Sequence, residues 1–206
     1  MKKLSINKFG GLAIISTCIA LFTAACNNNT NTSTTDSLNN VSDTATALTE
    51  GDAKDINKDK FSGDSLKPDA KAVVTAFTSG MEEIAMSEAA TSRSTNAEVK
   101  KFAETMITAH KKLNEEMAAL AASKGITLPA ALDEGQQKDV ANLTAESNFD
   151  KEYIDKAVAA HKDAVKLFDD QSKDANDPDI KAAFAKNLAE IRHHLEMAEK
   201  LQKKIK

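Results

Sequence analysis

The sequence contains few of the residues that cross-link or stiffen a small protein. Its 206 residues include two cysteines, no tryptophan and one tyrosine. Cys18 lies inside an apolar N-terminal run, and Cys26 follows that run directly. If the run is removed as a signal and Cys26 carries lipid, the chain keeps no free thiol and no disulfide. The fold must then be held together by its apolar core alone.

Several catalytic patterns are also absent from the sequence. It has no glycine-rich phosphate loop, no serine or cysteine nucleophile in a recognisable turn, and no histidine–aspartate pair at a telling spacing. The segment DANDPD, Asp174 to Asp179, lacks the glycine and the terminal glutamate of a calcium loop and is typical of a turn followed by a helix N-cap. No catalytic activity is predicted. The sequence leaves open whether the protein is an enzyme, and these absences favour a protein without catalytic activity.

A basic surface is missing too. The whole chain has 27 Lys and Arg against 31 Asp and Glu, and removing three lysines with the signal leaves 24 − 31 = −7. An acidic chain without a basic stripe or interleaved aromatic residues is a poor candidate for nucleic-acid binding. We therefore expect no nucleic-acid partner, and the sequence does not identify a protein partner.

The N-terminus is typical of an exported protein. Lys2, Lys3 and Lys8 precede the apolar run GLAIISTCIALF, which is too short for an ordinary transmembrane helix, and TAAC follows it. This layout resembles the bacterial lipoprotein signal, in which cleavage leaves a cysteine, here Cys26, to carry acyl chains such as palmitate. The sequence therefore predicts a signal peptide over residues 1–25 and a lipoprotein that a membrane of the cell envelope holds through its lipid, facing the periplasm or at the outer membrane. An ordinary signal peptide cut at Ala-Ala-Cys and an uncut anchor are the alternatives.

Residues 26–66 and residues 67–206 differ in composition. The first segment is rich in Asn, Ser, Thr and Asp and nearly free of large apolar residues, so it cannot bury enough surface to offset its ordering entropy. It is predicted to be a flexible tether. In the second segment apolar residues recur every three or four positions, and no run has the period of two of a strand, which predicts an all-α domain.

Helix-start and helix-stop signals divide this domain into four long helices. Pro68 is suited to a first turn, Asn96 and Asp177 are N-cap residues, SNFD at 147–150 resembles a capping box, and Gly125 ends the second helix. The helices are predicted to run over 68–93 and 96–125, and from 147 and 177 onward. Two helical hairpins of this kind make a four-helix bundle. The long segment between them, with a short helix at 133–145, permits the crossover of a ferritin-like bundle.

Two stretches carry a family resemblance. NAEVKKFAETMITAHKKLNEEMAALAASKGITLP begins at Asn96, and FDKEYIDKAVAAHKDAVKLFDDQSKDANDPDIKAAFAKNLAEIRHHLEMAEKLQ begins at Phe149. They resemble the bacterial domain-of-unknown-function 4142 family, whose members are often labelled membrane proteins or lipoproteins and whose domain is described as ferritin-like. The resemblance covers roughly residue 68 to the C-terminus, implies the fold and adds little on activity. Its most specific matches fall on His110, His161 and His194.

All four histidines of the chain lie in this domain, and two of them interrupt apolar helix stripes. His110 and His161 each lie 14 residues after their predicted caps (110 − 96 and 161 − 147), so they reach one level if their helices are parallel. Glu83 falls within about a turn of that level. We therefore expect a polar layer of His110, His161 and a carboxylate from the 68–93 helix. The residues proposed to bind a transition metal are His110, His161, Glu83, Glu190, His193 and His194.

The choice of metal depends on what this set lacks. Ferritin-like di-iron proteins use two Glu-x-x-His motifs, but Ile107 and Val158 occupy two of the expected glutamate positions, and only Glu190-Ile-Arg-His193 remains. A nitrogen-rich set favours zinc, copper or a similar metal over a di-iron centre. The alternative is a structural or protein-interaction lipoprotein with no metal and no catalysis, in which the histidines are packing residues. His193 and its neighbour cannot both face inward, because adjacent residues point to different sides of a helix.

Overall fold

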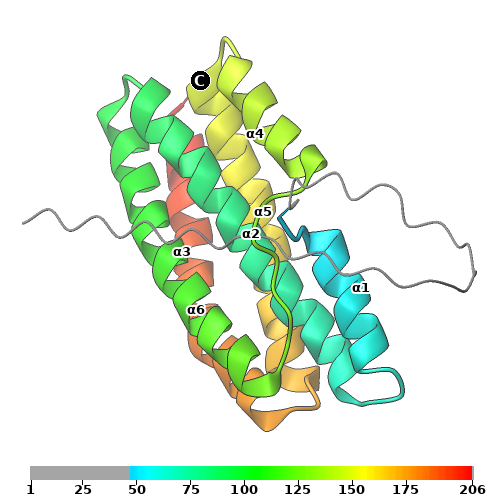
Figure 1. Cartoon of the computed structure of the whole chain (residues 1–206). Coiled ribbons are helices and arrows are strands. Elements are labelled where there is room, and N and C mark those ends of the chain that lie inside the picture. Colours follow the sequence, from blue (N-terminus) through cyan, green and yellow to red (C-terminus); the bar gives the residue numbers. More distant parts are fainter. Residues whose placement is uncertain (1–46, 206) are drawn as a thin grey trace, which may run out of the picture. The chain divides into compact units, whose positions relative to one another are not determined.

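The computed structural model describes residues 47–205. Within that range six helices account for the regular secondary structure and no strand is present (Figure 1), which confirms the all-α prediction. The predicted signal peptide, the Cys26 anchor and the first part of the predicted tether, up to residue 46, lie outside the described residues. The helices are α1 (Glu50–Lys60), α2 (Leu66–Arg93), α3 (Ala97–Lys124), α4 (Glu134–Ala145), α5 (Phe149–Asp174) and α6 (Pro178–Gln202).

The long helices begin and end close to their predicted positions because most of the expected caps form. The Asn96 side chain accepts hydrogen bonds from two backbone N–H groups of the first turn of α3, and Gly125 ends that helix at a left-handed φ of 66°. Asp177 caps α6 in the same way as Asn96 caps α3. The capping box predicted at Ser147 is wrong. The N-cap is Asn148, whose φ of −101° and ψ of 47° depart from the extended conformation of a capping residue, and it makes no side-chain cap bond.

A helix that the sequence did not predict, α1, precedes the four long helices. Thr49 and Asp52 form a capping box at its start, and Asn57 is buried at 2% exposure. The Asn57 side chain donates to the carbonyl of Thr127 and accepts from its N–H, each at 2.8 Å. The predicted tether is therefore wrong over Glu50–Lys60. Composition missed this helix because few apolar residues attach it to the fold: Ala53 and Phe61 are buried in the core, and the buried Asn57 adds a polar contact.

The four long helices associate as two antiparallel pairs. α2 packs along α3 and α5 along α6, and the pairs meet through α2 with α5 and α3 with α6. The connection from α3 to α5 contains α4, which packs against α2 and α5, and it runs back along the length of the helices (Figure 1). As a result α3 and α5 point in the same direction. Residues at similar distances from the starts of α3 and α5 therefore lie at similar levels.

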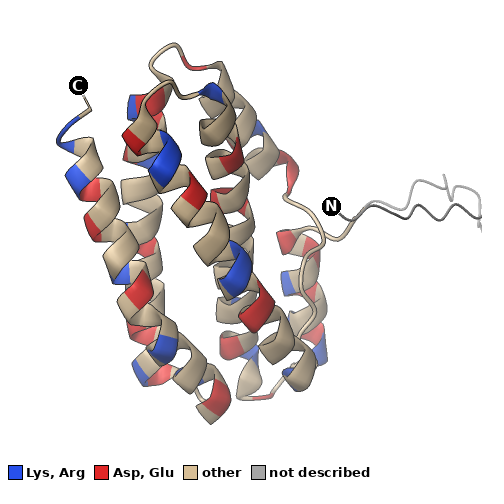
Figure 2. Cartoon of the chain, turned by 90° about the vertical axis from the view of Figure 1, so that its left-hand side faces the viewer, with Lys and Arg blue, Asp and Glu red and all other residues tan. Residues whose placement is uncertain are grey.

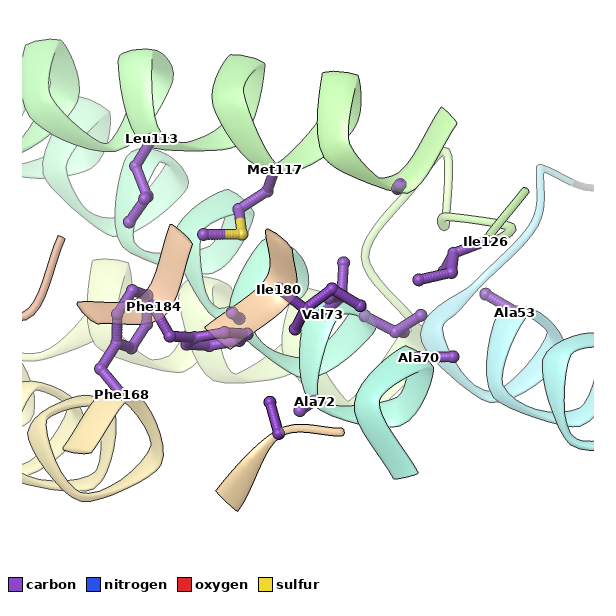
Figure 3. Packing of buried hydrophobic residues seen from close by; sticks show 14 of the residues in the cluster. Ala53, Ala70, Ala72, Val73, Leu113, Met117, Ile126, Phe168, Ile180 and Phe184 are labelled. Carbon is purple, nitrogen blue, oxygen red and sulfur yellow. The ribbon is translucent and has the colours of Figure 1, made fainter. Parts of the chain in front are cut away.

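Two clusters of buried apolar residues fill the space between the helices. The first, shown in part in Figure 3, includes Val73, Leu113, Met117, Phe168, Ile180 and Phe184. The second includes Met86, Phe102, Met106, Tyr153, Ile154 and Ala198. The three buried histidines lie at the boundary between the two clusters.

The boundary can be followed along the helices. On α3, His110 lies between Met106 of the second cluster and Leu113 of the first. His161 on α5 and His194 on α6 occupy the corresponding positions on their helices. The apolar core is thus interrupted by one polar layer.

The outer faces of the helices carry charges of both signs in alternation (Figure 2). Exposed pairs one helical turn apart, such as Lys166–Asp170 and Lys151–Asp155, are typical of solvated helix faces. Of the helices between residues 47 and 205, none combines the length and the apolar character that a membrane span requires.

Candidate metal centre

Three buried histidines from three helices converge in the polar layer. His110 comes from α3, His161 from α5 and His194 from α6, and their exposed fractions are 5%, 1% and 4%. Their ring centroids are 5.5 to 5.6 Å apart in each pair. One nitrogen from each ring lies within 4.8 Å of the other two, and within residues 47–205 no other group of three potential ligand side chains is this close.

The ring nitrogens differ in whether they have hydrogen-bond partners. His161 Nδ1 lies 2.8 Å from the carbonyl oxygen of Ala157, to which it donates its proton, so its Nε2 keeps a free lone pair. Neither nitrogen of His110 has a hydrogen-bond partner in the described part of the chain, and the same holds for Nε2 of His161 and Nδ1 of His194. Four buried nitrogen atoms, from three rings, are thus left without partners inside the protein.

Burial keeps these histidines neutral. It lowers the pKa of His110 to about 3 and that of His194 to about 4, and the neighbouring imidazoles add to both effects. The pKa of His161 is lowered by burial as well, against the opposing effect of its bond to the Ala157 carbonyl. At neutral pH the three rings therefore present lone pairs, which is the form that binds metal ions.

Glu83 on α2 is the carboxylate of the layer. It is 5% exposed, its Oε1 lies 4.0 Å from His161 Nδ1, and its Oε2 has no partner among the residues described. Desolvation, with a smaller contribution from Glu82, raises its pKa to about 8. Glu83 therefore lies at the Nδ1 edge of His161 and is not one of the three mutually close ligand groups.

Of the six residues predicted from the sequence, the structure brings together His110, His161, His194 and Glu83. The remaining two lie elsewhere: His193 is on the exposed face of α6, and Glu190 is exposed with its Oε1 4.0 Å from His194 Nε2. The predicted Glu190-x-x-His193 pair is thus replaced by a Glu190–His194 pair one residue wider. The spacing of His194 from Ile191 and Ala198, three and four residues, already marked it as the inward one.

A second polar contact next to the layer was not predicted. The hydroxyl groups of Ser87 on α2 and Tyr153 on α5 lie 2.9 Å apart, and both side chains are completely buried. Ser87 is one helical turn beyond Glu83, and Tyr153 is two turns before His161. These spacings of four and eight residues place Ser87 and Tyr153 on the inward faces of their helices, and they are the sequence signal that could have indicated this contact.

The fold and the layer together define a class: a helical bundle with a buried cluster of three neutral histidines that could hold a metal ion. Residues 57–201 match the family described as Domain of unknown function (DUF4142), and the chain belongs to this family, as the sequence resemblance predicted. The matched range includes Glu83 and all four histidines. No curated protein and no solved structure matches the chain.

Proposed function

We propose that the three-histidine cluster binds a transition-metal ion in a lipid-anchored protein of the cell envelope. The observation that supports the metal most strongly is the convergence of buried nitrogen atoms that have no hydrogen-bond partner in residues 47–205. An unpaired buried polar group costs about 1–3 kcal/mol. One metal ion would pair three of these nitrogens at once.

The spacing of the nitrogens is compatible with one shared ion. Bonds of about 2.0–2.1 Å to a tetrahedral zinc place its ligand nitrogens about 3.4 Å apart. The three nitrogens lie within 4.8 Å of one another, so they would have to approach by up to about 1.4 Å to share one ion.

The surroundings of two rings resemble the outer contacts of known metal ligands. A metal-bound histidine commonly donates its second N–H to a backbone carbonyl or a carboxylate, which fixes the tautomer. The Ala157 carbonyl has this role for His161 Nδ1, and the Glu190 carboxylate lies 4.0 Å from His194 Nε2. If this gap closed to hydrogen-bonding distance, Glu190 would act as an orienting group rather than as a ligand.

The donor set favours zinc, copper(II), cobalt(II) or nickel(II), since imidazole suits these borderline metals. We infer a ferritin-like arrangement from the two helical hairpins and the long connection that makes α3 and α5 parallel (Figure 1). The layer departs from carboxylate-bridged di-iron chemistry, because it offers three nitrogens and only one carboxylate. A single ion is therefore the form we propose.

Metal analysis of the full-length protein, purified without a polyhistidine tag, tests this function. We expect about one zinc or copper ion per chain and a rise in melting temperature on zinc addition, because an ion that binds only the folded state stabilises it. His161→Asn should lose both. His193→Asn is the matched control, since His193 is an exposed histidine on the same bundle, and it should behave like the unmodified protein.

The competing function is a structural or interaction lipoprotein whose histidines only pack. It predicts no metal in the purified protein, and no difference between His161→Asn and His193→Asn in zinc-dependent melting. Either result would remove the metal from the proposal and leave the helical bundle as a scaffold.

The anchor is proposed from the sequence around Cys26. Acylation of this cysteine would hold the domain at a membrane without any spanning helix. We expect Cys26→Ser to move the protein from the membrane fraction to the soluble fraction after cell disruption. Unchanged partitioning of this variant would contradict the lipoprotein assignment.

A further inference from the structure

A cavity adjoins the histidine cluster on the side of α2 and α5. Its volume is about 420 Å³, and its polar walls include Glu83, His110 and His161. Much of the remaining wall is formed by small or apolar side chains, among them Ala76, Ala164 and Phe168. Two of the three proposed metal ligands therefore border this cavity.

The cavity exists because the helices that border it carry very small residues there. Gly80 of α2, which has no side chain, is one of the lining residues. Ala76 stands one turn before Gly80, and α5 contributes Ala160 and Ala164 to the same space. Short side chains on facing helices leave volume that larger residues would fill.

The distribution of the ligands among the helices indicates on which side of the metal site the cavity lies. The three nitrogens come from α3, α5 and α6, and α2 contributes none. The α2 side of the cluster instead presents Glu83, whose Oε2 is buried and has no hydrogen-bond partner within the described residues. Three protein ligands leave a tetrahedral ion with one further position.

From this geometry we propose that the metal keeps an open coordination position facing the cavity, where a water molecule binds and exchanges for small monodentate anions. This inference rests on the proposed metal site. Glu83 lines the same cavity and its buried Oε2 has no partner among the described residues, so we expect it to accept a hydrogen bond from water in that cavity. Structural zinc sites have four protein ligands and no open position. A site with an open position is of the other type, at which water or another small ligand binds to the metal.

The dimensions of the cavity limit the ligand. Sites for drug-sized molecules have volumes of about 300–1,000 Å³, so this cavity is at the small end. Ala159, Ala160 and Asp163 are exposed residues of its lining and form its mouth. A triatomic anion such as azide is much smaller than this volume, so we choose it as the probe ligand.

The test uses the full-length protein loaded with cobalt(II), whose visible absorption reports coordination number and ligand exchange. We expect azide to change the spectrum in a saturable titration. Ala160→Leu and Ala164→Leu, which narrow the mouth and the interior, should keep one cobalt per chain and lose at least tenfold in azide affinity. Ala182→Leu is the matched control, an exposed alanine of α6 outside the cavity lining, and should bind azide as the unmodified protein does.

The outcomes separate this inference from the proposed function. A cobalt-loaded protein whose spectrum does not respond to azide has a closed metal site, which overturns the open position and leaves metal binding intact. Equal azide affinity in the unmodified protein and in both leucine variants overturns the role of the cavity. Failure of the protein to take up cobalt, zinc or copper overturns the metal site and this inference together.

Discussion

Replacing Glu83 by glutamine should change how the stability of the metal-free protein depends on pH. The carboxyl group is buried in the polar layer, and its pKa is about 8 in the folded protein against an ordinary value of 4.5. Between these two values the unfolded chain releases a proton that the folded chain retains. Folding is therefore progressively disfavoured as pH rises from 4.5 to 8, and the full penalty is present above pH 8. Glutamine has nearly the same shape and does not titrate.

The size of the effect follows from the difference between the two pKa values. One pKa unit corresponds to about 1.4 kcal/mol. Between pH 5 and pH 8 the unmodified protein should thus lose about 3 kcal/mol of unfolding free energy relative to Glu83→Gln. The neutral histidines also affect stability in acid, but they are present in both proteins and cancel in the comparison.

Urea denaturation in the presence of a chelator, at pH 5 and at pH 8, measures this difference. The quantity of interest is the change between the two pH values, because the extra N–H of glutamine adds a cost that is the same at both. Glu115→Gln alters an exposed glutamate of α3 and serves as the control. If the stability curves of the unmodified protein and Glu83→Gln run parallel, Glu83 is not held protonated by burial and the description of the layer is wrong.

Three further predictions concern the metal and the contacts of α1. Metal uptake at pH 7 should release close to one proton more from the unmodified protein than from Glu83→Gln, because a nearby cation favours the ionised carboxylate. Calorimetry in two buffers of different ionisation enthalpy measures the number of protons released. His110→Leu should raise the stability of the metal-free protein by about 1 kcal/mol in urea denaturation, since it removes two unpaired buried nitrogens, and should abolish metal binding. Asn57→Ala should lower the unfolding free energy by about 1–3 kcal/mol, because it leaves both backbone groups of Thr127 without their partner, whereas the exposed Asp55→Ala should change it by less than about 0.5 kcal/mol.

The sequence predicted the long helices well because their signals are local. The Asn96 and Asp177 caps and the apolar period of three to four residues depend on neighbours in the chain, and the structure contains them at the expected positions. The level of His110 and His161 could also be calculated, because an α-helix rises by a fixed distance per residue. For the two histidines to meet, α3 and α5 must also be parallel. The length of the segment that connects these helices permits a parallel arrangement but does not require it (Figure 1).

The parts that the sequence did not predict depend on contacts between distant segments. Two hydrogen bonds between the Asn57 side chain and the backbone of Thr127, 70 residues away, help to hold helix α1 in place. An apolar stripe in the sequence does not indicate a contact of this kind. The choice between His193 and His194 is an exception, because the local spacing from Ile191 and Ala198 indicated His194, whereas the Glu-x-x-His pattern pointed to His193. The cavity beside Glu83 arises from small residues on two helices that face each other, and neither helix alone indicates an empty space.

The composition of the polar layer argues that it is kept for a reason other than stability. The clusters on either side are apolar, and leucine at the position of His110 would join them into one core. The layer instead buries three imidazoles and a carboxylate, and within residues 47–205 these four side chains make a single hydrogen bond, from His161 to the Ala157 carbonyl. Packing alone would select against such an arrangement, because each unpaired group lowers stability. A ligand that pairs the histidine nitrogens offsets this cost only when it is bound, so the layer is best explained as a site whose stability and protonation respond to its occupancy.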